Sequence, residues 1–174
     1  LVDCSAGVST ATGKMASAWV ARGLGFVDAP VSGVAARAKD GTPSIMAGGD
    51  PATLEKAMPW LRRMGTTILH VGGAGAGQLT KLVNQLLFDA NMAVLAEVLP
   101  MAVKMGLDPE KTGEIVNSGT GRSYASEFFI PRILENSFSA GYPMEHAYKD
   151  LVRGYLVSAM DGLPRPVGPA PTAR

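Results

Sequence analysis

The chain has 174 residues, of which 47% are hydrophobic and 18% charged, and its formal net charge is +1. This composition suits a folded protein with a buried core, and it provides no concentration of positive charge for nucleic acid. The single Cys4 cannot form an internal disulfide, and His70 and His146 have no partners at zinc-ligand spacing. We therefore expect a reducing, cytoplasmic location, no metal site and no nucleic-acid partner.

The first 73 residues alternate between strand and helix patterns. Short apolar runs that predict strands lie at residues 1–5, 24–33, 43–49 and 66–72. A helix is predicted from Ser9 or Thr10, either of which could cap it, to Gly23. A second predicted helix has Asp50 as its N-cap and Pro51 at its first position. Such alternation predicts an α/β layer with a largely parallel sheet.

After residue 77 the sequence shows only helical patterns. The predicted helices span residues 77–106, with a possible kink at Pro100, then 108–119, 123–137 with a break near Pro131, and 143–162. Asp108, before Pro109, is the predicted cap of the second of these helices. The fold class is therefore α/β followed by all-α. We place the domains at residues 1–74 and 75–174, with a long interdomain helix opening the second.

The long apolar helix could also be mistaken for a membrane span. Its stretch from 78 to 99 is interrupted by Lys81, Asn84, Gln85, Asp89, Asn91 and Glu97. Such groups are expensive in lipid. We therefore expect a buried helix of a soluble protein and no membrane partner.

The glycine-rich stretch GGAGAGQLTK, at residues 72–81, resembles a phosphate-binding loop only superficially. A Walker loop would need lysine after Gly77, where Gln78 stands. A dinucleotide fingerprint would need glycine at that same position, and it would follow the first strand, whereas this loop follows the last. A hinge that leads into the long helix is the simpler interpretation.

Lys81 is a candidate acid/base residue. It shares one helix face with Asn84, Gln85 and Phe88, and apolar residues flank that face. The helix N-terminus and apolar surroundings would both disfavour an ammonium and lower the lysine pKa toward neutrality. A lysine that extends its charge to solvent from a helix start would give the same pattern. The pattern alone does not decide between the two.

Four motifs occur in an order that resembles a known family. DAPVSG at residues 28–33, IMAGGD at 45–50, GAGQLTKLVNQ at 75–85 and YKD at 148–150 are similar to motifs of the β-hydroxyacid dehydrogenases, and the resemblance covers roughly residues 1–165. The resemblance implies the second half of a Rossmann-like domain, a long interdomain helix and a helical C-terminal domain. It also implies hydride transfer between NAD or NADP and a short β-hydroxyacid similar to 3-hydroxyisobutyrate or 2-hydroxy-3-oxopropionate.

The resemblance also assigns roles to residues. Lys81 matches the catalytic acid/base. Positions that match substrate-binding residues, with a carboxylate as the ligand, are Ser32, Gly33, Val34, Asn84, Gln85, Arg122 and Ser123. Positions that match cofactor-binding residues are Ser5, Ala6 and Lys149. Small residues with free backbone N–H groups, as in the SG pair, are suited to a carboxylate.

Three departures from the family are visible. No G-x-G-x-x-G fingerprint occurs, so the chain lacks the first half of the Rossmann domain, which we expect before Leu1. The family usually has the sequence SGG where this chain has SGV, so Val34 stands at the position of a glycine. Ala6 stands where the family usually has threonine. An alternative function is therefore a catalytically incomplete module that dimerises through exposed apolar surface. We expect a homo-oligomer, either a dimer or a tetramer. The choice between NAD and NADP is not encoded in these residues.

Overall fold

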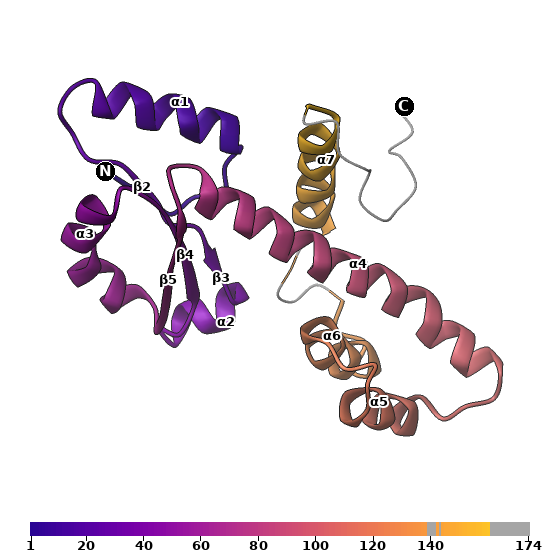
Figure 1. Cartoon of the computed structure of the whole chain (residues 1–174). Coiled ribbons are helices and arrows are strands. Elements are labelled where there is room, and N and C mark those ends of the chain that lie inside the picture. The colour runs from indigo at the N-terminus through magenta and orange to yellow at the C-terminus, as the bar shows by residue number, and fades with distance from the viewer. Residues whose placement is uncertain (139–141, 143, 161–174) are drawn as a thin grey trace. The chain divides into compact units, whose positions relative to one another are not determined.

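A computed structural model describes residues 1–138, 142 and 144–160 (Figure 1). The proline-rich tail and the side chain of His146 lie outside the described part. The chain divides into two compact units, Leu1–Val83 and Asn84–Arg174, and the α4 helix passes from one into the other. The predicted domain boundary at residue 74 differs from this division because the first turns of α4 pack on the sheet of the first unit.

The first unit contains one mixed sheet. Its strands are β1 (Val2–Asp3), β2 (Val27–Asp28), β3 (Val31–Ser32), β4 (Ser44–Gly49) and β5 (Thr67–Gly72). β1 runs parallel to β2, and β5 runs parallel to β4. β2 and β3 are consecutive parts of one extended segment, and both pair with β4 in the antiparallel direction.

The predicted fold class is confirmed, but the sheet is less parallel than we expected. The reason is the connection between Ser32 and Ser44, which holds only the short helix α2 (Val34–Lys39). A parallel crossover needs about a dozen residues or more, including a helix long enough to cover the sheet. The chain instead reverses direction, and β4 runs back beside β2 and β3.

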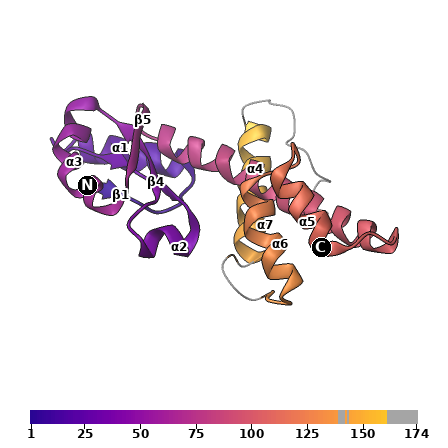
Figure 2. The same cartoon turned by 90° about the horizontal axis from the view of Figure 1, so that it is seen from below.

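The two faces of the sheet are used differently. Alternate residues of the central strands face the hydrophobic core, where Val27 and Ile45 are fully buried against Leu61 of α3 (Pro51–Met64). The intervening residues, Asp28 and Met46, lie against the start of α4 (Ala76–Lys104). The sheet of the first unit thus lies between α3 and the first turns of α4, as Figures 1 and 2 show.

Two of the predicted helix N-caps are confirmed and one is wrong. Asp50 caps α3 by accepting a hydrogen bond from the Thr53 N–H at 2.9 Å, as predicted. Asp108 caps α5 (Pro109–Ser118) in the same way. The helix α1 (Ser9–Val20), however, has Val8 at its N-cap and no side-chain cap, so the prediction of a Ser9 or Thr10 cap is wrong.

Two glycines allow α4 to approach the sheet closely. A Cβ placed on Gly77 would collide with the Met46 carbonyl oxygen and would lie 2.7 Å from Oδ2 of Asp28. A Cβ on Gly48 would lie 2.6 Å from Oδ1 of Asp28 and 2.8 Å from the Gly77 nitrogen. Gly48 and Gly77 therefore serve close backbone packing, a use of glycine that is distinct from a hinge.

The described part of the second unit is helical. Besides the rest of α4 it contains α5, α6 (Tyr124–Leu134) and α7 (Met144–Met160), and α5 and α6 lie side by side (Figure 2). The predicted break at Pro131 does not occur, because α6 continues to Leu134. Leu86 of α4 packs against α7 at Gly154, where a Cβ would lie only 2.8 Å from the leucine side chain.

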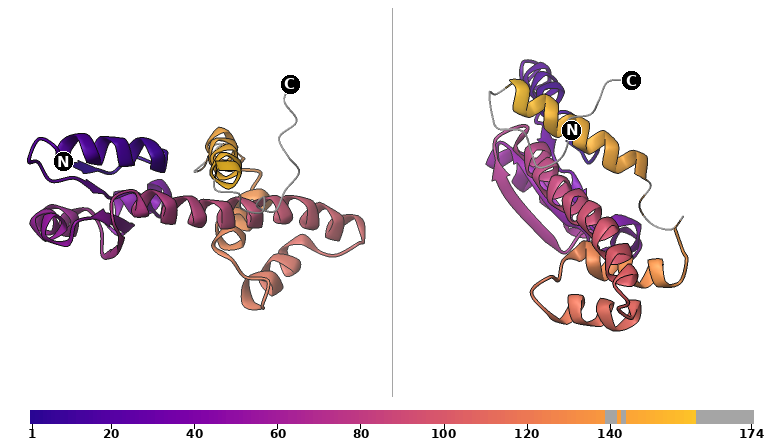
Figure 3. Two further views of the ribbon diagram at one scale, coloured as in Figure 1. Left: turned by 45° about the horizontal axis from the view of Figure 1, so that its top comes forward. Right: turned by 90° about the vertical axis from the view of Figure 1, so that its right-hand side faces the viewer.

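The prediction that α4 is a buried helix is wrong for much of its length. Leu87 is 63% exposed and Val94 is 59% exposed, although both are apolar. Figure 3 shows α4 as one long helix. By length and composition alone α4 could cross a membrane, which is weak support for a span. Its Gln85 and Asp89 are buried in a polar network of the second unit, described below.

Substitution of Gly77 tests the close packing of α4. We expect Gly77→Ala to lower the free energy of unfolding by about 2 kcal/mol or more, because the added methyl meets rigid backbone. Chemical denaturation followed by circular dichroism would measure it. Gly73→Ala is the matched control in the same loop, since nothing lies within 4 Å of its added Cβ. Equal stability of the two variants would contradict the packing described here.

Candidate functional site

Two of the predicted binding segments lie at the same edge of the sheet. Because β1 runs parallel to β2, both β1 and the segment β2–β3 end in the same direction. The loop with Ser5 and Ala6 follows β1, and the segment Ser32–Val34 ends β3 and opens α2. Loops at the carboxyl ends of parallel strands are the usual place for ligands in α/β sheets.

Asp28 fixes the start of α4 above this sheet. Its side chain is fully buried, and its carboxylate accepts hydrogen bonds from the N–H groups of Gly75 at 2.8 Å and Gln78 at 3.0 Å. Gly75 directly precedes α4 and Gln78 lies in its first turn, where N–H groups have no intrahelical acceptor. A residue from a distant strand therefore performs the task of an N-cap, and its negative charge lies at the positive end of the helix dipole.

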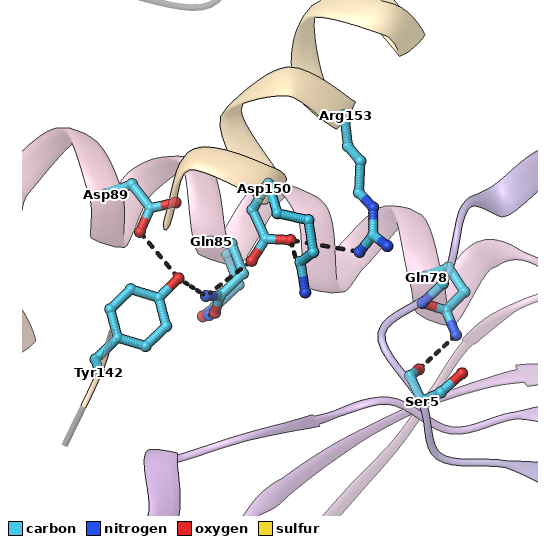
Figure 4. A network of polar contacts seen from close by, with 10 residues as sticks. Ser5, Gln78, Gln85, Asp89, Tyr142, Asp150 and Arg153 are labelled. Carbon is cyan, nitrogen blue, oxygen red and sulfur yellow. Dashed lines mark hydrogen bonds and ion pairs between the residues drawn. The ribbon is translucent and has the colours of Figure 1, made fainter. Parts of the chain in front are cut away.

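Gln78 connects the same helical turn to the loop after β1. Its Oε1 accepts a hydrogen bond from the Gly7 N–H, and its Nε2 donates one to the Ser5 carbonyl, both at 2.8 Å. The side chain is only 3% exposed. Figure 4 shows the contact with Ser5. The backbone of the predicted cofactor loop is thus held by one amide of α4.

Lys81 lies one turn after Gln78 on α4 and is partly buried. Asn84 follows after a further turn and is exposed, with its Nδ2 3.2 Å from Oε1 of Gln85. The helix therefore presents Lys81 and Asn84 in the order expected from the sequence. Their roles in substrate binding and catalysis stay predictions.

The predicted carboxylate loop has an unusual backbone. Gly33 has φ 136°, and Val34 has φ 52° in the left-handed region. Glycine adopts such angles without penalty, whereas a β-branched residue is strained there. Val34 occupies the position at which the sequence departs from the family's glycine. Strain of this kind concentrates at functional sites, and it costs on the order of 1–3 kcal/mol.

Gln85 belongs to a buried polar network in the second unit (Figure 4). Its Nε2 donates to the Tyr142 hydroxyl at 3.0 Å and lies 3.4 Å from Oδ2 of Asp150. The Tyr142 hydroxyl in turn donates to Oδ1 of Asp89 at 3.3 Å. Burial, and then the charges of Asp89 and Asp150, raise the pKa of Tyr142, so its hydroxyl keeps its proton and remains a donor. The side-chain amide of Gln85 therefore has hydrogen-bond partners within the protein. Its role in substrate binding, which the family resemblance implies, stays a prediction.

Lys149 lies beside this network on α7. Its Nζ is 3.6 Å from Oδ1 of Asp150, and Arg153 approaches the same oxygen at 3.5 Å. The Asp150 side chain is 8% exposed, whereas that of Lys149 is 41% exposed. Asp150 is thus compensated by two cations, and Lys149 keeps an accessible ammonium that could meet an anionic ligand.

Arg122 and Ser123 lie just before α6, and both have partners in that helix. Ser123 is the N-cap of α6 and forms a capping box with Ser126, in which each side chain accepts from the other residue's N–H. Arg122 donates to Glu127 at 2.6 Å, and both side chains are largely exposed. The buried Oδ1 of Asn117, near the end of α5, has no hydrogen-bond partner among the residues that the structure describes. Substrate contact by Arg122 and Ser123 stays a prediction.

Two family models together match most of the chain. Residues 1–72 match the NAD-binding domain of 6-phosphogluconate dehydrogenase, and residues 75–169 match the model described as NAD-binding of NADP-dependent 3-hydroxyisobutyrate dehydrogenase. The chain belongs to the β-hydroxyacid dehydrogenase family. The resemblance read from the four sequence motifs is therefore confirmed, and so is the cofactor class, NAD or NADP.

Individual β-hydroxyacid dehydrogenases support the same assignment. The chain is 44% identical over 152 residues to 2-(hydroxymethyl)glutarate dehydrogenase of Eubacterium barkeri, covering 87% of this chain and 50% of that protein. It is 36% identical over 158 residues to 3-hydroxyisobutyrate dehydrogenase of Pseudomonas aeruginosa, covering 87% and 53%. The chain thus spans about half the length of the curated relatives it matches.

A solved structure agrees with the fold. The 3-hydroxyisobutyrate dehydrogenase of Mycobacterium tuberculosis, determined with L-serine, superimposes with a TM-score of 0.87 at 30% identity. The match covers 95% of this chain and 59% of that one. The arrangement of an α/β unit and a helical unit joined by a long helix is therefore that of a β-hydroxyacid dehydrogenase.

The loop after β1 is built of small residues. Ser5, Ala6 and Gly7 are small, Ser5 and Ala6 are exposed, and their backbone is held in place by Gln78. Small side chains at the carboxyl end of a strand leave room for a cofactor such as NAD or NADP. Cofactor binding by Ser5 and Ala6 stays a prediction.

Relief of the strain at Val34 provides a test of the loop geometry. We expect Val34→Gly to raise the free energy of unfolding by about 1 kcal/mol, since the relieved strain exceeds the added chain entropy. Ala35→Gly, at the next position in α2, adds the same entropy without relieving strain and should lower stability. Thermal unfolding of both variants makes the comparison. Equal destabilisation by the two glycines would show that Val34 is not strained.

Proposed function

We propose that the chain takes part in NAD(P)-dependent oxidation of the hydroxyl group of a short β-hydroxyacid, similar to 3-hydroxyisobutyrate or 2-hydroxy-3-oxopropionate. The observation that supports this most directly is the arrangement around the start of α4. There Gln78 holds the predicted cofactor loop, and Lys81 follows one turn later on the same helix. The family membership reported above supports the reaction class.

In the proposed mechanism each group has a separate task. The nicotinamide, when bound, supplies the acceptor for a hydride from the hydroxyl-bearing carbon. Lys81 takes the proton of that hydroxyl through its Nζ, and in the reverse direction it returns the proton. Backbone N–H groups of the segment Ser32–Val34 bind the substrate carboxylate, and Asn84 orients it. Ser5 and Ala6 hold the cofactor.

Lys81 is the residue on which the proposed chemistry depends. With NAD⁺ or NADP⁺ and a set of short β-hydroxyacids, we expect the chain to form reduced nicotinamide, detected by its absorbance. Lys81→Met keeps the length of the side chain but removes the amine, and it should lower kcat by roughly 10²–10⁴-fold. Lys104→Met, in the last turn of α4, is the matched control. Turnover that survives Lys81→Met would refute the acid/base role.

A second candidate function is supported by the exposed apolar side of α4. Leu87, Val94 and Met101 are spaced by seven residues, which brings them to one side of a helix, and each is more than half exposed. A catalytically incomplete module that assembles through this surface is the alternative. The occupant we propose is a second copy of the chain, as in an isologous homodimer.

The oligomeric state of the chain tests whether it assembles through this surface of α4. We expect the chain to be dimeric in size-exclusion chromatography with light scattering at micromolar concentration. The double variant Leu87→Glu, Val94→Glu should be monomeric, because two charges per copy would be buried in the interface. Trp60→Glu, an equally exposed apolar position on α3, should leave the dimer intact. A chain that stays monomeric at high concentration would exclude the assembly function, whether or not it turns over substrate.

A further inference from the structure

We propose that Gln78 is a positioning residue that holds the Ser5–Gly7 loop to the helical turn leading to Lys81. In the context of the proposed dehydrogenase reaction, on which this inference rests, one side chain then fixes the cofactor loop and the acid/base residue to each other. Gln78 itself takes no direct part in the proposed reaction. Its task is to keep the two from moving independently.

The hydrogen bonds of Gln78 use both ends of its amide. The Gly7 N–H must meet an acceptor and the Ser5 carbonyl must meet a donor, so the orientation of the amide is fixed by its partners. Both contacts are 2.8 Å long and connect residues more than 70 positions apart in the chain. A side chain with a donor and an acceptor at this reach is required, and glutamine provides it.

The backbone of Gln78 is anchored independently of its side chain. Its N–H donates to Oδ2 of the buried Asp28, whose other oxygen accepts from Gly75. Asp28 therefore keeps the helix start in place even when the amide is changed. Loss of the amide should release the loop while leaving α4 on the sheet, and this separates a positioning role from a contribution to the fold.

The residues around Gln78 also suggest a variant whose loop contact depends on pH. In Gln78→Glu a protonated carboxyl could still donate to the Ser5 carbonyl and accept from Gly7, whereas a carboxylate could only accept. Burial, together with the negative charges of Asp28 on β2 and Asp3 on β1, would raise the pKa of the introduced carboxyl, and Lys81 on the same helix would oppose this. Burial and Asp3 also raise the pKa of Cys4, so that thiol remains neutral, and α1 contributes the uncharged Thr12 beside Gly7.

Amide hydrogen exchange of Gly7, measured by NMR as a protection factor, tests the proposal without any need for turnover. In Gln78→Met we expect the protection of the Gly7 amide to fall about five- to tenfold, the equivalent of one hydrogen bond. In Gln78→Glu we expect protection close to that of the unsubstituted chain near pH 5 and a similar loss at about pH 8. Leu79→Glu adds the same charge at an exposed position of the same turn and should change neither value.

The outcomes separate this inference from the proposed reaction. Unchanged Gly7 protection in Gln78→Met, or loss at both pH values in Gln78→Glu, would overturn the positioning role. Where the chain turns over substrate, Gln78→Met should lower kcat more than it weakens NADH binding, because the loop remains present but displaced. Failure of turnover with the expected exchange pattern would reject the dehydrogenase proposal and leave the structural link between Gln78 and the loop intact.

Discussion

The burial of one carboxylate determines how the first unit is built. Asp28 has no exposed surface, and an ionised group in that position is tolerable only when its oxygens are hydrogen-bonded. The N–H groups of Gly75 and Gln78 satisfy it, and the positive end of the α4 dipole adds to this stabilisation. Gly75 directly precedes α4 and Gln78 lies in its first turn, so Asp28 on β2 holds the start of the helix on the sheet.

The close approach of α4 to the sheet explains two glycines, one on β4 and one in the first turn of the helix. Gly48 and Gly77 leave no room for side chains where the helix meets β4, and Gly75 has φ 92° as the chain enters the helix. Larger residues at the first two positions would push the N–H groups away from Asp28. Close packing at Gly48 and Gly77 and the hydrogen bonds of Asp28 and Gln78 therefore act together to hold the start of α4. The position of Lys81, one turn further along the helix, depends on them.

The second unit organises its polar groups by a different rule. Gln85, Asp89 and Tyr142 face one another inside a helical layer, and two cations on α7 compensate Asp150. Networks of this kind are stabilising only when nearly every member finds a partner. Gln85 thus has a structural reason to be glutamine besides the substrate contact that the family resemblance implies. The exposed apolar residues of α4 support the proposal of a second copy.

The sequence by itself determined the periodic and local features. Alternating patterns marked all the longer strands and helices, and Asp50 and Asp108 were recognised as caps because a cap depends on residues only three positions away. The family followed from four ordered motifs. The short helix α2 was not predicted, since six residues show too little periodicity.

Only the tertiary structure decided the features that join distant residues. The antiparallel direction of β4 depends on how the chain turns between Ser32 and Ser44. The exposure of Leu87 depends on which other elements pack against α4. The roles of Asp28 and Gln78 were invisible for the same reason. In the sequence Asp28 is only an acidic residue within an apolar run. Gln78 is only the residue whose presence rules out a Walker loop and a dinucleotide fingerprint at this position. Their partners lie about 50 and 70 positions away, and hydrogen bonds over such separations leave no periodic signal in a sequence.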